Sequence, residues 1–127
     1  MHLHIAFSHA PIVIPAVGFL SHEIGAIAEF QGVVRAQEGS QILQGLHYEA
    51  YLPMADKELR RIFEELHRAY PCDSVEFIHR LGWVPVAETS LWIRVQSRHR
   101  AQAFSLLAES ITRMKAVVPI WKTAPAP

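Results

Sequence analysis

The chain has 127 residues, enough for one domain with a real core but short for two. Half of the residues are hydrophobic, which excludes a disordered tail, and no apolar run approaches the roughly 20 residues that span a bilayer. The opening MHLHIAFSHA lacks a basic start followed by a long apolar run, so we expect no signal peptide and a cytoplasmic protein. The single cysteine, Cys72, can form neither an internal disulfide nor by itself a zinc site, and we expect it to fill a helix-to-strand turn.

The net charge is zero, but it is unevenly distributed along the chain. Residues 1–93 contain six Lys and Arg against eleven Asp and Glu, whereas residues 94–127 contain six against Glu109 alone. This split suggests a positive site for an anion or a docking face, and an ordinary solvated basic face explains it equally well.

The first half of the chain predicts mostly strands. Three stretches have the β-branched, aromatic or alternating composition of strands: 3–8, 25–35 and 42–51. Gly32 interrupts the second of these, where we expect a bulge. The apolar stretch 11–22 contains two prolines and predicts a short helix entered from a turn. A polar loop with Gly39 as its turn residue joins the second and third strands, and we expect 25–51 to form a long hairpin.

The second half predicts two helices around two strands. The helix at 54–70 has apolar residues at helical spacing, and Pro71 ends it. Strands are predicted at 74–82 and 89–97, where apolar and polar residues alternate. A last helix at 98–118 would have Ser97 as its N-cap and leave the helical path at Pro119. Its predicted buried stripe consists of Phe104, Leu107, Ala108, Ile111 and Met114.

The order β, α, β, β, α, β, β, α mixes hairpins with helices and lacks strict βαβ alternation. We therefore predict an α+β fold with a mainly antiparallel sheet. The closing residues 123–127, TAPAP, predict a short disordered tail.

The stretch MKAVVPIWK, residues 114–122, places two amines beside apolar surface. A partly desolvated Lys115 would be a usable acid, base or nucleophile, and Trp121 could shield Lys122 likewise. The simpler interpretation of Lys115 is a cation that suits the C-terminus of a helix. Arg35 ends the strand in FQGVVR and could bind phosphate or carboxylate, although a plain loop-entry arginine is the simpler interpretation.

His99 and Arg100 would lie in the first turn of the last helix, where free backbone N–H groups bind anions. Cations are slightly unfavourable there, so an anionic ligand would explain them, and an ordinary exposed basic turn is the alternative. Sixteen residues of helix separate His99 from Lys115, about 24 Å, so the two cannot meet within one straight helix. They serve different sites, or a second subunit brings its own His99 to Lys115.

Other kinds of chemistry lack a sequence signature. Eight histidines invite a metal site, but there is no HExxH motif and no Cys/His pair, so we expect no metal. P-loop, GxGxxG and GxSxG motifs are absent. Nucleic-acid binding remains a weak competitor, since basic residues and tryptophans occur without an RNP-like or helix-turn-helix pattern.

Taken in order, the quoted segments resemble the MoaE family, the large, catalytic subunits of molybdopterin synthase. The matching segments are GAIAEFQGVVR, LHYEAYLPMA, HRLGWVPVAETSLWIRVQSRHRAQAF and MKAVVPIWK. The two HR pairs and the closing K-x(3)-P-x-W-K are specific in combination, and the match covers most of the chain from Gly25 onward. The resemblance implies a single hammerhead-like α/β domain over 1–122 with an added β-hairpin subdomain.

The resemblance also implies an activity and partners. Two such subunits would form a homodimer, and each end would bind one small ubiquitin-like sulfur carrier of the MoaD type, giving a heterotetramer. The carrier's C-terminal thiocarboxylate would enter a pocket and pass sulfur to cyclic pyranopterin monophosphate, giving the dithiolene of molybdopterin. No cofactor is implied. Both reactants are anionic, so their encounter requires fixed positive charge.

The family positions carry over to named residues of this chain. Lys115 matches the principal catalytic lysine, for acid/base work and for holding the carrier's terminal carbonyl, and Lys122 matches the second, for charge stabilisation beside the pterin. The substrate-binding positions implied are Arg35, His99, Arg100, Val33, Val34 and Phe30. His99 and Arg100 would grip the phosphate from the neighbouring subunit, and Phe30 is equally well explained as a core aromatic.

Two alternatives stay open. The closing segment KTAPAP, which begins with the second lysine, departs from the family pattern. This departure favours a non-catalytic relative that docks the carrier as a scaffold or regulator. A module that binds anions or nucleic acid through the basic last third is the other alternative.

Overall fold

The computed structural model describes residues 1–18 and 21–124. Its helices and strands are, in chain order, β1 His2–Ser8, β2 Ala26–Val33, β3 Gln37–Glu38, β4 Gln41–Ile42, β5 Gly45–Ala50, α1 Leu52–Ala69, β6 Ser74–Arg80, β7 Gly82–Pro85, β8 Thr89–Ser97, α2 Arg100–Val117 and β9 Ile120–Thr123. The predicted α+β class is confirmed, whereas β7 and β9 were not predicted.

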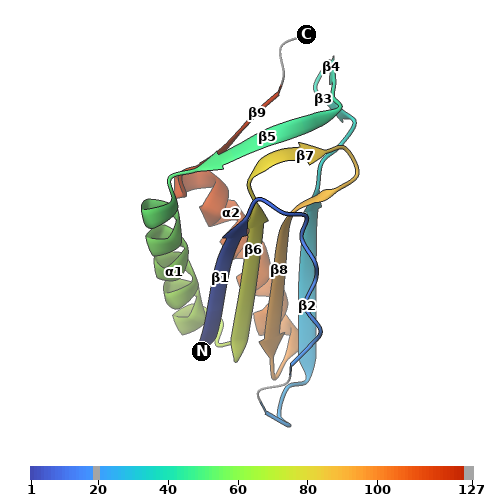
Figure 1. Ribbon diagram of the computed structural model, residues 1–127. Coiled ribbons are helices and arrows are strands. Elements are labelled where there is room, and N and C mark those ends of the chain that lie inside the picture. The colour runs from blue at the N-terminus through green and yellow to red at the C-terminus, as the bar shows by residue number, and fades with distance from the viewer. Residues whose placement is uncertain (19–20, 125–127) are drawn as a thin grey trace.

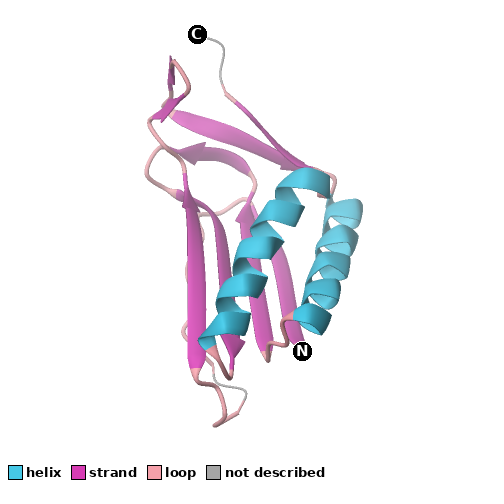
Figure 2. Cartoon of the chain, turned by 180° about the vertical axis from the view of Figure 1, so that it is seen from behind, coloured by secondary structure: helices cyan, strands magenta, loops and turns pink. Residues whose placement is uncertain are grey.

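A four-stranded sheet in the order β1-β6-β8-β2 forms the body of the molecule, and both helices cover one of its faces (Figures 1 and 2). The β6–β8 and β8–β2 pairs are antiparallel, as predicted, and β1 lies parallel to β6. The register between β2 and β8 shifts between Gly32 and Val33, which confirms the predicted bulge.

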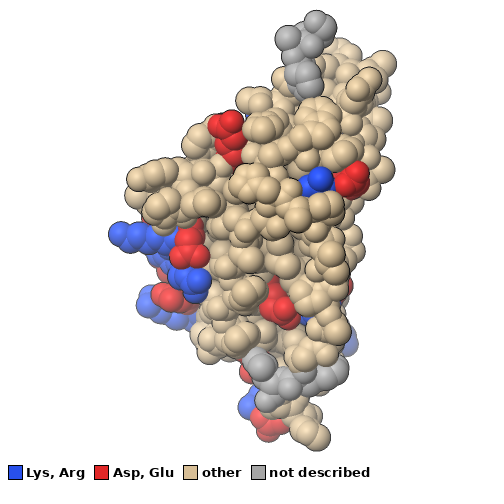
Figure 3. All heavy atoms as spheres, in the orientation of Figure 1, with Lys and Arg blue, Asp and Glu red and all other residues tan. Residues whose placement is uncertain are grey.

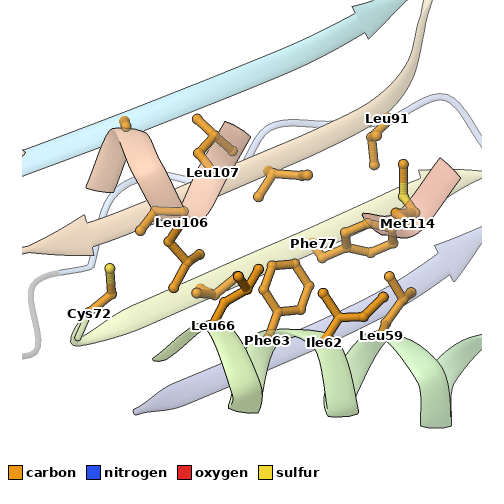
Figure 4. Packing of buried hydrophobic residues seen from close by; sticks show 14 of the residues in the cluster. Leu59, Ile62, Phe63, Leu66, Cys72, Phe77, Leu91, Leu106, Leu107 and Met114 are labelled. Carbon is orange, nitrogen blue, oxygen red and sulfur yellow. The ribbon is translucent and has the colours of Figure 1, made fainter. Parts of the chain in front are cut away.

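The main hydrophobic core lies between the large sheet and the two helices. In the close view, Leu59, Ile62, Phe63 and Leu66 of α1 point toward Phe77 of β6 (Figure 4). These are the apolar residues whose spacing predicted the helix. Each large side chain buried this completely stabilises the fold by roughly 1.5–3 kcal/mol, so this face of α1 fixes the helix on the sheet.

The buried face of α2 differs from the predicted one. Leu107 and Met114 are buried as predicted, but Phe104 is 61% exposed. The other buried residues of α2 are Ala103, Leu106 and Ser110. Apolar residues occur on several sides of this helix, so their spacing alone does not select one face. The helix also begins later than predicted, with His99 as N-cap, and Ser97 Oγ–H donates to the His99 carbonyl oxygen at 2.5 Å.

The predicted helix at 11–22 is wrong over the described part of that stretch, because residues 11–18 form neither helix nor strand. The chain there runs across the face of the large sheet opposite the helices (Figure 1). Arg94 of β8 donates to the Pro15 carbonyl oxygen at 2.7 Å, and Gln96 donates to the Gly18 carbonyl oxygen at 3.0 Å. Side chains of the sheet therefore satisfy backbone carbonyls that a helix would have paired internally.

A second, three-stranded sheet in the order β7-β5-β9 lies beyond one end of the large sheet (Figure 1). The predicted long hairpin over 25–51 is therefore wrong, because β2 pairs with β8 while β5 pairs with β7 and β9. Only the short pair β3–β4 forms a hairpin between them. A small second core lies beneath this sheet: Val34, Leu43, Leu46 and Val84.

The last strand, β9, belongs to this second sheet. Thr123 lies within β9, opposite His47 of β5, so the predicted disordered tail cannot start at residue 123. Residues 125–127 of that prediction lie outside the described residues. Within the described part of the chain, neither helix has the length and apolar character needed to cross a membrane.

Candidate anion-binding site

A cavity of about 660 Å³ opens between the two sheets and the end of α2. Its lining comes from the end of β2 and the residues that follow, from β5, from the end of β6, from the last turns of α2 and from β9. The cavity thus lies where two separately packed cores meet, which is a common place for a ligand site.

Arg35 reaches the cavity because β2 ends in a bulge. The register shift between Gly32 and Val33 releases the chain from β8, and Val34 then turns into the second core with 2% exposure. The Val34 N–H donates to the Glu88 carbonyl oxygen at 3.1 Å, and the Val34 carbonyl oxygen accepts from Ala87 N–H at 2.8 Å. Arg35 follows this anchored residue and lines the cavity.

Lys115 and Lys122 reach the same cavity from the two sides of the short connection between α2 and β9. Lys115 lies in the last turn of α2, which ends at Val117. Pro119 has no N–H to continue the helix, and its carbonyl oxygen accepts from Tyr51 N–H at 3.1 Å. The chain then enters β9, where Lys122 lies opposite Tyr48 of β5. Both lysines line the cavity.

The three cations differ in their partners. Lys122 Nζ donates to Glu38 Oε1 at 2.6 Å. Within the described residues, neither Arg35 nor Lys115 forms a salt bridge or a side-chain hydrogen bond, and both side chains are exposed. Lys115 is therefore not the partly desolvated amine that its sequence neighbours suggested. Two cations without a bound carboxylate at one cavity form a site suited to an anion.

Glu38 was not predicted as a site residue. The hydrogen bond and charge of Lys122 hold the pKa of the Glu38 carboxyl below its ordinary value, and the charge of Arg35 acts in the same direction. Its sequence signal was weak, since an acid in the polar loop RAQEGSQ resembles any exposed loop residue. Nothing in the sequence indicated that β9 would bring Lys122 next to this loop.

His79 and Tyr48 also line the cavity, and neither was predicted to do so. Their rings lie 5.1 Å apart in an edge-to-face arrangement. His79 is 4% exposed, and burial lowers the pKa of its imidazole, while a backbone hydrogen bond opposes this shift. Nδ1 lies 2.8 Å from the Arg80 carbonyl oxygen. A carbonyl only accepts, so Nδ1 carries the proton and Nε2 of the neutral ring keeps a lone pair.

The apolar site residues predicted from the family pattern, Phe30, Val33 and Val34, all line the cavity. Phe30 also packs against the main core, so its two proposed roles are compatible. Val33 is half-exposed, in contrast to its buried neighbour Val34. These residues give the cavity an apolar wall beside its cations.

The structure of the single chain does not bring His99 and Arg100 to this cavity. His99 is the N-cap of α2 and Arg100 is its first residue, whereas Lys115 lies in its last turn (Figure 2). The 16 residues from His99 to Lys115 correspond to a helical rise of about 24 Å. The proposed supply of these two residues by a neighbouring subunit stays a prediction.

Most of the cations in the basic last third of the sequence are paired with carboxylates. Four of its six cations pair with carboxylates from the first 93 residues: Arg94 with Glu29 and Glu76, Arg98 with Glu23, Arg113 with Glu65, and Lys122 with Glu38. Figure 3 shows charged groups gathered along α1, while the face in front of the large sheet has few of them. A broad nucleic-acid surface therefore finds no support here.

Other candidate chemistry is placed elsewhere. Cys72 is buried in the main core, where burial chiefly raises the pKa of its thiol to about 11, so it stays protonated and unreactive. Among the residues described, no three His, Cys, Asp or Glu side chains gather closely enough to hold a metal ion.

The fold and the cavity together define an α+β protein with a cation-lined cavity suited to an anion. The family model described as MoaE protein matches residues 7–117, and the chain belongs to this family. The chain is 44% identical to the molybdopterin synthase catalytic subunit of Homo sapiens over 99 residues, which is 77% of this chain and 52% of that protein. It is 39% identical to the same subunit of Staphylococcus carnosus over 98 residues, 77% of this chain and 65% of that protein.

The crystal structure of molybdopterin synthase from Staphylococcus aureus is similar in fold, with a TM-score of 0.79 and 33% sequence identity. The superposition covers 85% of this chain and 79% of that chain. This likeness agrees with the predicted hammerhead-like domain. The chain spans about half the length of the human relative that it matches. The activity of the whole human protein is therefore only proposed for this chain.

Proposed function

We propose that this chain is the catalytic subunit of a molybdopterin synthase, a cytoplasmic sulfurtransferase of molybdenum cofactor biosynthesis. It would take sulfur from the thiocarboxylated C-terminus of a small ubiquitin-like carrier and pass it to cyclic pyranopterin monophosphate, forming the dithiolene. Family membership and the shared name of the relatives support the reaction. The observation that carries the proposal is the convergence of Arg35, Lys115 and Lys122 on one cavity.

The proposed roles follow from charge. A thiocarboxylate and a cyclic phosphate repel each other, and fixed cations in a cavity offset that repulsion without reorganising during the reaction. Lys115 would hold the carrier's terminal carbonyl and transfer protons there. Lys122 would stabilise negative charge beside the pterin, and Arg35 would anchor its phosphate. Phe30, Val33 and Val34 would form the apolar wall that limits access of water.

Replacement of the two lysines tests these roles. Lys115→Ala should abolish dithiolene formation, by at least about 100-fold, because it removes a group acting on the reacting atoms. Lys122→Ala should weaken transfer less, since it removes charge stabilisation alone. The measurement is dithiolene formed per minute when the protein is mixed with thiocarboxylated carrier and pyranopterin substrate. Both lysines are exposed, so the variants should unfold at the same urea concentration as the wild type.

Lys57→Ala is the matched control, because Lys57 is an exposed lysine of α1 that does not line the cavity. It should retain the wild-type rate. A Lys115→Ala variant with an unchanged rate would contradict the assigned role. If the wild type binds the carrier but forms no dithiolene, the scaffold alternative is correct.

A further inference from the structure

One carboxylate, that of Glu38, lies among the described residues that line a cavity suited to anions. Its Oε1 lies 2.6 Å from Lys122 Nζ. A bound carboxylate of this kind occupies the place on Lys122 that the oxygen of an anionic ligand would take. The site therefore holds an anion of its own before any ligand arrives.

The ion pair joins two segments that are far apart in the sequence. Glu38 belongs to the hairpin β3–β4, which forms a two-stranded sheet by itself (Figure 1). Gly39 and Ser40 at the tip of this hairpin are exposed, and Ile42 at its base is 83% exposed, so apolar packing contributes little to holding the hairpin. Lys122 belongs to β9, which is paired with β5. The Glu38 side chain thus reaches from a lightly packed hairpin to a fixed strand.

The pair is ionised but weak. Lys122 lowers the pKa of the Glu38 carboxyl, so Glu38 carries its charge throughout the neutral range. The Lys122 and Glu38 side chains are 48% and 38% exposed. Ion pairs exposed to this extent exchange readily with other ions, because water and salt screen their attraction. Such a contact can be replaced by a ligand that binds Lys122 more strongly.

We propose that Glu38 takes the place of the ligand anion in the empty cavity, where it holds Lys122, and that it is displaced when an oxyanion binds that also contacts Arg35 or Lys115. This inference deepens the proposed function, since it concerns the same cavity. A tethered carboxylate competes at an effective concentration on the order of millimolar. A free carboxylate that contacts Lys122 alone gains nothing over it, whereas an oxyanion that also reaches Arg35 or Lys115 does. Glu38 therefore favours phosphate-type ligands over simple carboxylates.

The test measures binding of inorganic sulfate, which stays doubly charged over the working pH range, by calorimetric titration at low ionic strength. Glu38→Gln removes the competing charge and should bind sulfate about 3- to 10-fold more tightly than the wild type. Acetate, as a single charge, should gain measurable affinity in the same variant. Glu23→Gln is the control, because it removes a carboxylate from a more exposed pair, with Arg98, that does not line the cavity. It should leave sulfate affinity unchanged.

Three results would overturn the proposal: equal sulfate affinity in Glu38→Gln and the wild type, weaker affinity in the variant, or no sulfate binding by either protein. Weaker affinity would mean that Glu38 serves only to orient Lys122 for the ligand. Sulfate binding requires no sulfur transfer, so these results are independent of the dithiolene assay. If the wild type forms dithiolene but Glu38→Gln binds sulfate no more tightly than the wild type, this inference alone is refuted. If the wild type forms no dithiolene but Glu38→Gln binds sulfate more tightly, the proposed function alone is refuted.

Discussion

His79 shows how a single residue links the cavity to stability. Its ring is buried and neutral, with Nδ1–H donating to the Arg80 carbonyl oxygen. Because burial lowers the pKa of His79 in the folded protein, the unfolded chain takes up a proton first as the pH falls. His79 therefore contributes stability above the ordinary histidine pKa and loses it as the pH falls toward the depressed folded value.

We expect the free energy of urea unfolding to fall as the pH is lowered from about 7 to about 5, by at most about 1.4 kcal/mol per pH unit from this group. His79→Asn, whose amide can replace the Nδ1–H donor, should be less stable but should lose this part of the pH dependence. His4→Asn, at an exposed position on β1, should keep it. Parallel pH profiles for the wild type and His79→Asn would contradict the prediction.

At the residue level, the sequence alone singled out Arg35, Lys115 and Lys122 as site candidates because each lies in a motif with family precedent, and all three line one cavity. It did not locate Glu38, Tyr48 or His79, because their roles come from neighbours distant in the chain. Lys122 lies 84 positions from Glu38. Hydrophobic spacing reports which side of an element is buried, but it carries no information about which loop will face that side.

At the level of elements, β5 depends on a close approach that only glycine allows. A Cβ added to Gly45 would lie 2.6 Å from the Val84 carbonyl oxygen and 2.6 Å from the Trp83 ring. Gly45→Ala should therefore destabilise the protein by about 1–3 kcal/mol, measured by urea unfolding. Gly18→Ala is the control, since a Cβ there would meet nothing within 4 Å. Equal effects of the two substitutions would show that β5 and β7 can separate at little cost.

Helices and central strands were predictable from sequence, while the pairing of strands was not. Residues 54–70 have one clear apolar stripe, and the observed α1 differs from the prediction only at its ends. The strand at 42–51 was found, but its assumed partner was the preceding strand, although β7 and β9 flank it. Alternation of apolar and polar residues defines a strand and leaves its neighbours undetermined. The short strands β7 and β9 had too few residues for a pattern to show.

At the level of the whole molecule, the proposed site is complete only if a second subunit supplies His99 and Arg100. Mixing Lys115→Ala subunits with Arg100→Ala subunits tests this. In a dimer with shared sites, one of the two sites in each mixed dimer is intact, so random exchange should restore about a quarter of the wild-type rate. Each variant alone should be inactive or nearly so. If the mixture is no more active than its components, each site is built within one chain.

The order of the strands in the large sheet also bears on how the chain folds. The two N-terminal strands, β1 and β2, do not touch each other and are connected only through β6 and β8. During synthesis, β1 has no partner strand until β6, at residues 74–80, has emerged from the ribosome, and β2 has none until β8, at residues 89–97, has emerged. Such dependence on distant contacts slows folding, and the early apolar strands have to stay soluble, without permanent partners, while most of the chain is made.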